Sequence, residues 1–242
     1  MTKKTLNQNA KYVKELEDIF EPDFLFSNQP FNRFKISDEN GKNASSDFEK
    51  KEKLLNLKRK INSIENCNLK SNAKNLVLGD GNISSPIMLI GESPGELEDK
   101  TGRSFQGDVG ELLKKMLIAI DINIEQVYLA YSINFRTPEN RKPSGQEIKR
   151  YSIFLKEHIS IISPKIIILM GSTAMESVTG LNGKISNERG IWKEIILGNK
   201  TYPLIITFSP SYLIRFPEFK KFSWMDLKKI KIKIKDLGVV FK

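Results

Sequence analysis

Four short, predominantly apolar runs, separated by amphipathic segments, constrain the fold more than any other feature of this sequence. They lie at residues 86–90, 127–133, 165–170 and 202–208. Strands that are apolar along most of their length are buried on both faces, which is typical of a parallel sheet covered by helices. The sequence therefore predicts an α/β fold with a central, mostly parallel, four-stranded sheet.

Helix starts are marked by a capping residue followed three positions later by glutamate. In this pattern each side chain accepts a hydrogen bond from a free backbone N–H of the first turn. The pairs are Ser46 with Glu49, Asp108 with Glu111, Ser144 with Glu147, and Thr173 with Glu176. They predict helices from 46 to about 65, from 108 to 120, from 144 to about 160, and a brief helix after 173. A last helix is predicted at 224–235.

The N-terminal part differs in composition from the rest. Residues 9–20 carry apolar side chains at helical spacing, and residues 21–45 are rich in Pro, Asn, Asp, Gly and Ser. We therefore expect an N-terminal extension at 1–45, made of a short helix and a loose linker, and a main domain at 46–242.

Charge and composition narrow the class of protein. The formal net charge is +10, which favours a polyanionic partner such as DNA; a lysine-rich proteome is the alternative explanation. A single cysteine and a single histidine exclude a disulfide within the chain and argue against a metal site. The polar N-terminus and the lack of an apolar run of membrane-spanning length predict a soluble, cytoplasmic protein with no membrane partner. We expect a monomer.

Four loops follow the four predicted strands, and ligands of such sheets bind outside the carboxyl ends of the strands. The loops are 91–107, 134–143, 171–173 and 209–215. We expect them to converge on one rim. The glycines at 79–81 and 91–95 fit neither the Walker nor the dinucleotide-binding pattern, which disfavours an ATP or NAD enzyme.

The first loop combines carboxylates with an aromatic residue. It carries Glu92, Glu96, Glu98 and Asp99, followed by Phe105. Carboxylates at a strand end can orient water or stabilise positive charge, and a phenyl ring can stack on a flat ligand. The alternative is that Glu98 and Asp99 are exposed loop acids and that Phe105 fills the core.

Two later loops carry cations beside proline. Arg136, Arg141 and Lys142 suit contacts with phosphates, or else form a solvated turn. In the segment from Ser209 to Arg215, the apolar pair Leu213 and Ile214 suits insertion into a duplex, or else is buried at a helix start. The final helix is rich in lysine, which fits either a solubilising face or a stripe that binds nucleic acid.

These motifs, in this order and at this spacing, resemble the uracil-DNA glycosylase superfamily, closest to its fourth family. The resemblance runs from about residue 67 to residue 227. It is carried by Cys67-Asn68-Leu69, Gly79-Asp80-Gly81, Gly91-Glu92-Ser93-Pro94-Gly95 with Glu98-Asp99, Phe105-Gln106-Gly107, the segment from Arg136 to Pro143, Arg189-Gly190, the segment from Pro210 to Arg215, and Trp224-Met225-Asp226-Leu227.

The resemblance implies a three-layer αβα domain that flips uracil out of DNA and hydrolyses its N-glycosidic bond. It assigns roles residue by residue. Glu92 and Ser209 would be catalytic; Gly91, Ser93, Gly95, Phe105, Tyr131 and Asn134 would bind the base; Arg136, Arg141, Lys142, Ser211, Leu213, Ile214 and Arg215 would contact DNA.

This chain departs from the family pattern at two site positions. Ser209 stands where the family has histidine, and Tyr131 stands where it has a base-reading asparagine, with Asn134 three residues on. A slower enzyme, an altered base preference and a DNA-binding protein without efficient cleavage all fit these changes.

A third departure concerns the four-iron, four-sulfur cluster that many relatives hold with four cysteines. Cys67 is retained, but the other three positions are Ile64, Phe135 and Tyr151. One thiolate cannot hold such a cluster. We therefore expect no cofactor, with apolar packing in that space.

Overall fold

The structure is a computed structural model that describes residues 39–65 and 67–241. Residues Asn43–Lys242 form one compact unit. The short helix predicted at 9–20 and most of the predicted linker lie outside the described residues. Residues 39–45 are helical, so the loose linker does not extend to residue 45 as predicted.

A six-stranded sheet forms the centre of the unit, in the order β1-β3-β2-β4-β6-β5. The strands are β1 (Gly79–Gly81), β2 (Ile87–Gly91), β3 (Tyr128–Tyr131), β4 (Ile166–Met170), β5 (Trp192–Leu197) and β6 (Lys200–Thr207). The four predicted strands are β2, β3, β4 and β6, which are parallel neighbours as expected. The prediction of only four strands was wrong, because β1 and β5 pair antiparallel at the two edges. Both are partly exposed, so neither is an apolar run.

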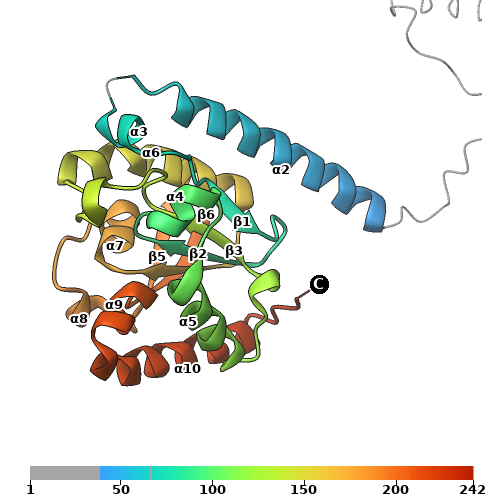
Figure 1. The fold of residues 1–242 in the computed structure, drawn as a ribbon. Coiled ribbons are helices and arrows are strands. Elements are labelled where there is room, and N and C mark those ends of the chain that lie inside the picture. Colours follow the sequence, from blue (N-terminus) through green and yellow to red (C-terminus); the bar gives the residue numbers. More distant parts are fainter. Residues whose placement is uncertain (1–38, 66, 242) are drawn as a thin grey trace, which may run out of the picture. The chain divides into compact units, whose positions relative to one another are not determined.

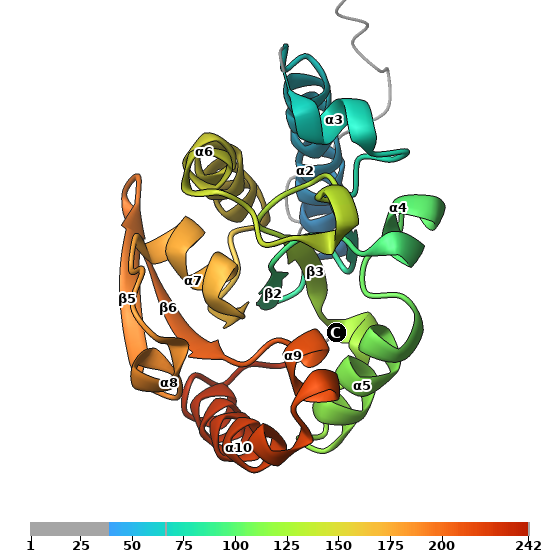
Figure 2. The same cartoon turned by 60° about the vertical axis from the view of Figure 1, so that its left-hand side comes forward.

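The helices are α2 (Glu39–Asn62), α3 (Asn68–Asn72), α4 (Glu96–Thr101), α5 (Gly107–Ile118), α6 (Gly145–Ile162), α7 (Ser172–Thr179), α8 (Ile185–Glu188), α9 (Pro210–Arg215) and α10 (Lys220–Asp236), with short 3-10 turns η1 (Ile124–Gln126), η2 (Pro138–Asn140) and η3 (Pro217–Phe219). Helices cover both faces of the sheet, as Figures 1 and 2 show, with α6 on one face and α5 and α10 on the other. The three-layer αβα architecture is therefore confirmed.

Side chains of successive strand residues alternate between the two layers. In β2, Ile87 and Leu89 pack in the cluster that holds α5 and α10, whereas Met88 and Ile90 pack in the cluster that holds α6 and α7. This alternation is the period of two that a pleated strand imposes. Because both faces are apolar, each strand reads as a continuous hydrophobic run.

The capping signals located one helix start accurately and missed three. At α6 the Ser144 hydroxyl accepts the Glu147 N–H at 3.3 Å, and the Glu147 carboxylate accepts the Ser144 N–H at 2.7 Å. The other helices begin earlier than their capping pairs predicted: α2 at Glu39, α5 at Gly107 and α7 at Ser172. Helix α10 also begins earlier than expected, at Lys220. A serine, threonine or aspartate with glutamate three positions on also fits inside a helix, so the pattern alone does not fix the start.

Candidate active site at the carboxyl edge of the sheet

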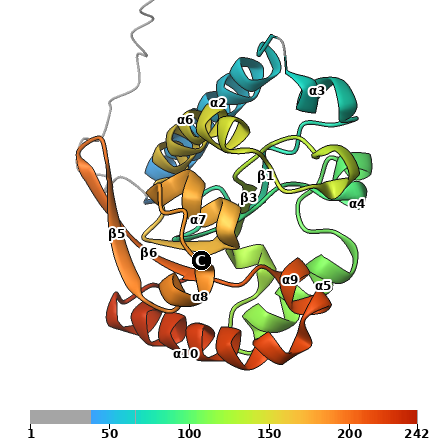
Figure 3. The ribbon, with the colours of Figure 1, turned by 90° about the vertical axis from the view of Figure 1, so that its left-hand side faces the viewer.

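A cavity of about 550 Å³ opens at the carboxyl ends of the parallel strands. All four predicted loops contribute to it, so the expected convergence is confirmed. In Figure 3, α7 and α9, which follow β4 and β6, lie at this carboxyl edge of the sheet. The lining residues are Gly91 to Gly95, Glu98, Phe105, Val109, Tyr131, Asn140 to Pro143, Ser172, Thr173, Ser209 to Tyr212, and Arg215.

Glu92 is held at the start of α7. Its Oε1 accepts the Thr173 N–H at 3.0 Å and the Ser172 hydroxyl at 3.4 Å. Gly171 adopts φ +104°, and a Cβ there would overlap the Glu92 carboxyl group, so a glycine makes room for this carboxylate. The positive end of a helix favours an anion. The Glu92 side chain is thus held in one orientation on the cavity wall, and no described residue donates to its Oε2.

A stacked pair of rings, Phe105 and Tyr131, forms the cavity floor. Their centroids lie 4.8 Å apart at an interplanar angle of 21°. The Tyr131 hydroxyl accepts the Phe105 N–H at 3.0 Å and donates to Glu98 Oε1 at 3.4 Å. At Gly91, a Cβ would lie 2.8 Å from the Phe105 ring and 2.9 Å from the Tyr131 ring, so only glycine allows both rings this close. One face of Phe105 is therefore covered by Tyr131.

The carboxylate of Glu98 holds the backbone on either side of this floor by hydrogen bonds. It is 5% exposed and accepts the N–H groups of Gly95 at 3.0 Å and Gln106 at 2.9 Å. Burial, followed by the neighbouring Glu98 carboxylate, raises the pKa of Tyr131 well above its ordinary value, so the phenol stays neutral. The alternative of exposed acids at Glu98 and Asp99 was wrong, since Asp99 is also buried and accepts the Lys74 N–H at 2.8 Å.

Ser209 closes another side of the cavity as the N-cap of α9. Its Oγ accepts the Tyr212 N–H at 3.3 Å and lies 3.1 Å from the Ser211 hydroxyl. Of the two alternatives for residues 209–215, the helix start is the one the structure shows, because proline at the first helical position of α9 follows a serine cap. Accepting the Tyr212 N–H does not use the hydrogen of the Ser209 hydroxyl, so this hydroxyl can still donate one hydrogen bond.

A buried ion pair fixes the strand end that precedes Ser209. Arg189 donates to Asp226 at 2.9 Å through Nε, and the Thr207 hydroxyl donates to the same carboxylate at 2.8 Å. The Arg189 guanidinium also lies 5.7 Å from the Phe208 ring centroid. Burial raises the pKa of Asp226 above its ordinary value, although Thr207 and Arg189 oppose this. Sequence reasoning singled out Arg189 and Asp226 as parts of two separate motifs but did not predict that they pair.

The predicted DNA-contacting residues of α9 do not all face solvent. Ser211 and Arg215 are exposed and line the cavity. Ile214 is 42% exposed, but Leu213 is 1% exposed and belongs to the core. The expected pair of exposed apolar side chains is therefore reduced to Ile214, because successive residues of a helix point in different directions.

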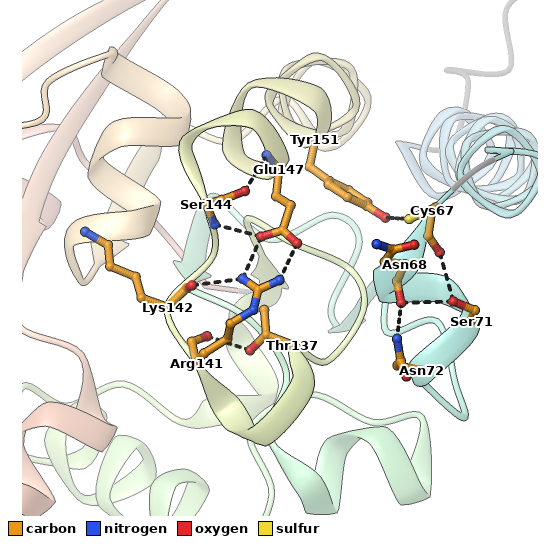
Figure 4. A network of polar contacts seen from close by, with 10 residues as sticks. All are labelled: Cys67, Asn68, Ser71, Asn72, Thr137, Arg141, Lys142, Ser144, Glu147 and Tyr151. Carbon is orange, nitrogen blue, oxygen red and sulfur yellow. Dashed lines mark hydrogen bonds and ion pairs between the residues drawn. The ribbon is translucent and has the colours of Figure 1, made fainter.

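The cations of the second loop are partly neutralised. Arg141 forms two hydrogen bonds with the Glu147 carboxylate, at 2.9 and 2.6 Å (Figure 4). The bonded Arg141 lowers the pKa of Glu147 from 4.5 to about 2. Arg136 donates to Asn140 at 2.8 Å and lies 3.6 Å from Glu96, outside the cavity lining. Lys142 lines the cavity, and no described residue pairs with its ammonium group.

Asn134 and His158 lie away from the cavity. Asn134 is 4% exposed, and its amide donates to the Val77 carbonyl at 3.1 Å, so it does not occupy a base-binding position here. His158 is buried in α6, 2.9 Å from the Tyr128 hydroxyl, and burial lowers its pKa to about 3. A neutral, buried imidazole in the helical layer cannot replace the histidine missing at Ser209.

The four positions that correspond to cluster ligands meet in one apolar cluster. Ile64, Cys67, Phe135 and Tyr151 pack together with Leu57, Ile61, Leu69 and Ile133. Cys67 Sγ lies 3.1 Å from the Tyr151 hydroxyl, as Figure 4 shows. Within the described residues no group of three or more His, Cys, Asp or Glu is placed to hold a metal. One thiol among apolar side chains does not fit an iron–sulfur cluster.

The fold and this rim define a uracil-DNA glycosylase-type domain, and comparison with known proteins agrees. The model of the uracil DNA glycosylase superfamily matches residues 78–228. The chain belongs to this superfamily. No helix in the described ranges is both long and apolar enough to span a membrane.

Individual relatives point to its fourth type. The chain is 39% identical over 175 residues to a type-4 uracil-DNA glycosylase of Thermotoga maritima, which covers 71% of this chain and 90% of that protein. It is 31% identical over 183 residues to a type-4 uracil-DNA glycosylase of Archaeoglobus fulgidus, covering 74% and 92%. It is also 31% identical over 151 residues to a DNA polymerase of Bacillus phage SP01, covering 62% of this chain but 16% of that protein.

Proposed function

We propose that this protein is a DNA repair glycosylase that excises uracil, or a related damaged base, by hydrolysing the N-glycosidic bond. The observation that carries the proposal is the joint lining of one cavity by Glu92, the Phe105–Tyr131 floor and Ser209. A cavity of about 550 Å³ has room for a flipped pyrimidine nucleotide. Flipping is needed because the target bond is inaccessible inside a base stack.

The reaction requires stabilisation of charge of both signs. As the bond between C1′ and the base breaks, its electron pair leaves with uracil and positive charge grows on the sugar. A water oxygen then bonds to C1′, and the proton that this water loses balances the base anion. Glu92, whose Oε2 is free of described partners, would orient this water and stabilise the sugar. The hydroxyls of Ser209 and Ser211 would donate to the departing base.

A second candidate function is a glycosylase-fold protein that binds DNA with little or no cleavage. It is favoured by the Tyr131 hydroxyl, which bonds to Phe105 and Glu98 and therefore does not read the edge of a base. Ser209 supplies a hydroxyl where an imidazole would reach farther. Loss of a preorganised donor of this kind lowers a rate by about 100- to 1000-fold.

Single-turnover cleavage of an end-labelled oligonucleotide with one uracil tests the proposal. We expect abasic product from the wild type and a rate lower by about 100-fold or more for Glu92→Gln, since a positioned acid–base group contributes that much. Glu96→Gln is the matched control, because Glu96 is exposed on α4 and pairs with Lys100. Retained DNA binding without abasic product at enzyme excess would favour the second candidate.

A further inference from the structure

One row of side chains on α10 is basic along its whole length. Lys220, Trp224, Lys228, Lys231 and Lys235 follow one another at intervals of four, four, three and four residues, and all five are exposed. Residues three and four apart are neighbours on a helix surface, so these side chains form one line. We call this line the α10 stripe. Along its length of about 22 Å it carries lysine at four positions and tryptophan at one.

The stripe is an exposed flank of α10, next to the row of side chains that faces the core. Leu227, Ile230 and Ile234 are buried in the cluster that contains α5. The aromatic member of the stripe remains accessible: Trp224 is 43% exposed, with the Lys228 ammonium 5.9 Å from its ring centroid.

Few acidic side chains neutralise the positive charge of the stripe lysines. Lys231 pairs with Asp121 of the neighbouring segment at 2.6 Å. Glu218 precedes the stripe and Asp236 follows it, and both are exposed. Asp226, on the same helix, is buried and bonded to Arg189. No described acid pairs with the remaining three stripe lysines.

The stripe begins close to the cavity. Arg215, the last residue of α9, lines the cavity rim, and η3 connects α9 directly to α10. Two apolar side chains beside Arg215 are also accessible: Ile214 of α9 is 42% exposed, and Phe216, which follows α9, is 38% exposed. A DNA strand whose base occupies the cavity would thus meet Arg215 first and the start of the stripe next.

We propose that the α10 stripe is a second DNA-binding surface, which contacts the phosphates of the duplex beside the nucleotide held in the cavity. The inference rests on the proposed function for its ligand, DNA. Lysines in a line suit a phosphate backbone because such contacts need charge rather than sequence. A stripe of about 22 Å spans about six base pairs at 3.4 Å per pair. Trp224 adds a flat ring that can pack against sugars or an unstacked base.

The test compares two triple variants that remove the same charge. Lys220→Gln/Lys228→Gln/Lys235→Gln removes the three unpaired stripe lysines. The matched control is Lys51→Gln/Lys58→Gln/Lys149→Gln, at exposed positions of α2 and α6, which lie on the opposite side of the sheet in Figure 1. Binding to a uracil-containing 30-base-pair duplex is measured by fluorescence anisotropy across a salt series.

We expect the dependence of log Kd on log salt to be shallower by about 2 to 3 for the stripe variant and unchanged for the control, because each lost phosphate contact changes this slope by about 0.9. Binding of a four-nucleotide single strand, which ends near the rim, should be the same for all three proteins. Equal slopes for the stripe variant and the control would overturn the proposal.

Tryptophan emission gives a second readout. The chain has two tryptophans, so Trp192→Phe leaves Trp224 as the only one. Its emission should change when the 30-base-pair duplex is added and stay constant with the four-nucleotide strand. Anionic phospholipid vesicles serve as a separate arm. If the stripe variant binds vesicles less tightly than the control, while the salt dependence of DNA binding is the same for both, the stripe binds a membrane surface and not DNA. That result would refute the proposal.

Failure of this inference differs from failure of the proposed function. If the protein excises uracil and the salt dependence of DNA binding is the same for the stripe variant and the control, only the proposed role of the α10 stripe is refuted. Stripe-dependent DNA binding without abasic product would refute only the glycosylase assignment. Absence of any DNA binding would refute both.

Discussion

Tyr131 and Tyr151 are two buried tyrosines that stand where the family resemblance expects other functional residues, and their surroundings differ. Around Tyr151, the partner positions Ile64 and Phe135 have also become apolar, and the whole region packs as core. Around Tyr131, the residues of the family motif remain: Gly91 lies against both rings, and Phe105 and Glu98 bond to its hydroxyl.

The surroundings of a replaced functional residue indicate whether its site has been lost or modified. Where the partners of a lost ligand have changed together, the function of the site has gone and packing has replaced it. Where the partners persist, the geometry around the replaced residue is kept, and the replacement changes one surface of the cavity. We therefore interpret Tyr151 as structural and Tyr131 as a change in the floor of the cavity.

The largest effect is expected from Ser209→His at the rim. If the rim is otherwise intact, an imidazole donor should raise the single-turnover rate of uracil excision by about 100- to 1000-fold. The same change removes the N-cap of α9 and should lower the free energy of unfolding by about 1 kcal/mol. Ser186→His, at an exposed position of α8 outside the cavity lining, is the control. An unchanged rate in folded Ser209→His would contradict the assignment of this loop.

Replacing Tyr131 by asparagine tests whether the floor governs base choice. Truncating this buried ring should lower the free energy of unfolding by about 3 kcal/mol. An asparagine amide held in one orientation matches the N3–H donor and O4 acceptor of uracil but not cytosine, whose edge carries them in reversed order, so excision of uracil relative to cytosine should rise. Denaturant unfolding and competition between two labelled oligonucleotides measure the two effects. An unchanged ratio would show that Tyr131 does not influence specificity.

The pair Tyr131→Phe and Tyr151→Phe applies one chemical change to both regions. At Tyr131 it leaves the buried N–H of Phe105 without its acceptor, a loss of about 1–3 kcal/mol in the free energy of unfolding. At Tyr151 it removes only a contact with Cys67, worth about 0.5–1.5 kcal/mol. Tyr131→Phe should also slow excision, because the Phe105 backbone (φ +50°) depends on that bond. Equal effects on excision would remove the distinction between the regions.

The smallest effect concerns Arg141 and its partner. Because Arg141 lowers the pKa of Glu147 from 4.5 to about 2, this pair stabilises the fold above pH 4.5, and its contribution disappears as pH falls from 4.5 towards 2. The difference in unfolding free energy between the wild type and Glu147→Gln should therefore shrink across that window. The variant also frees Arg141 beside the cavity, so DNA should bind slightly more tightly at low salt. A difference independent of pH would contradict the pairing.

The sequence predicted the four central strands well because each is buried on both faces. Residues 86–90 and 165–170, for example, coincide with β2 and β4 to within one residue at each end. It missed β1 and β5 because edge strands need no apolar run: β1 is Gly79–Gly81, and β5 alternates in exposure.

At the site, the sequence located the loops but not the partners within them. That Arg141 bonds to Glu147 depends on how the second loop folds back onto α6. That Asn134 bonds to Val77 rather than facing the cavity depends on contact between segments distant in the chain. Neither choice has a local signal, because the residue types alone suit both outcomes.

The parallel sheet, the rim where its loops meet and the lack of a full set of cysteines all follow from the order of residues along the chain. Periodicity, loop position and residue identity are local properties, so they can be read along the chain. Three features depend on the packing of the whole chain: Tyr131 covers Phe105, Leu213 is core while Ile214 is exposed, and four lysines of α10 line one exposed flank of that helix. These outcomes depend on which surfaces are buried against each other, and burial is settled when the whole chain packs.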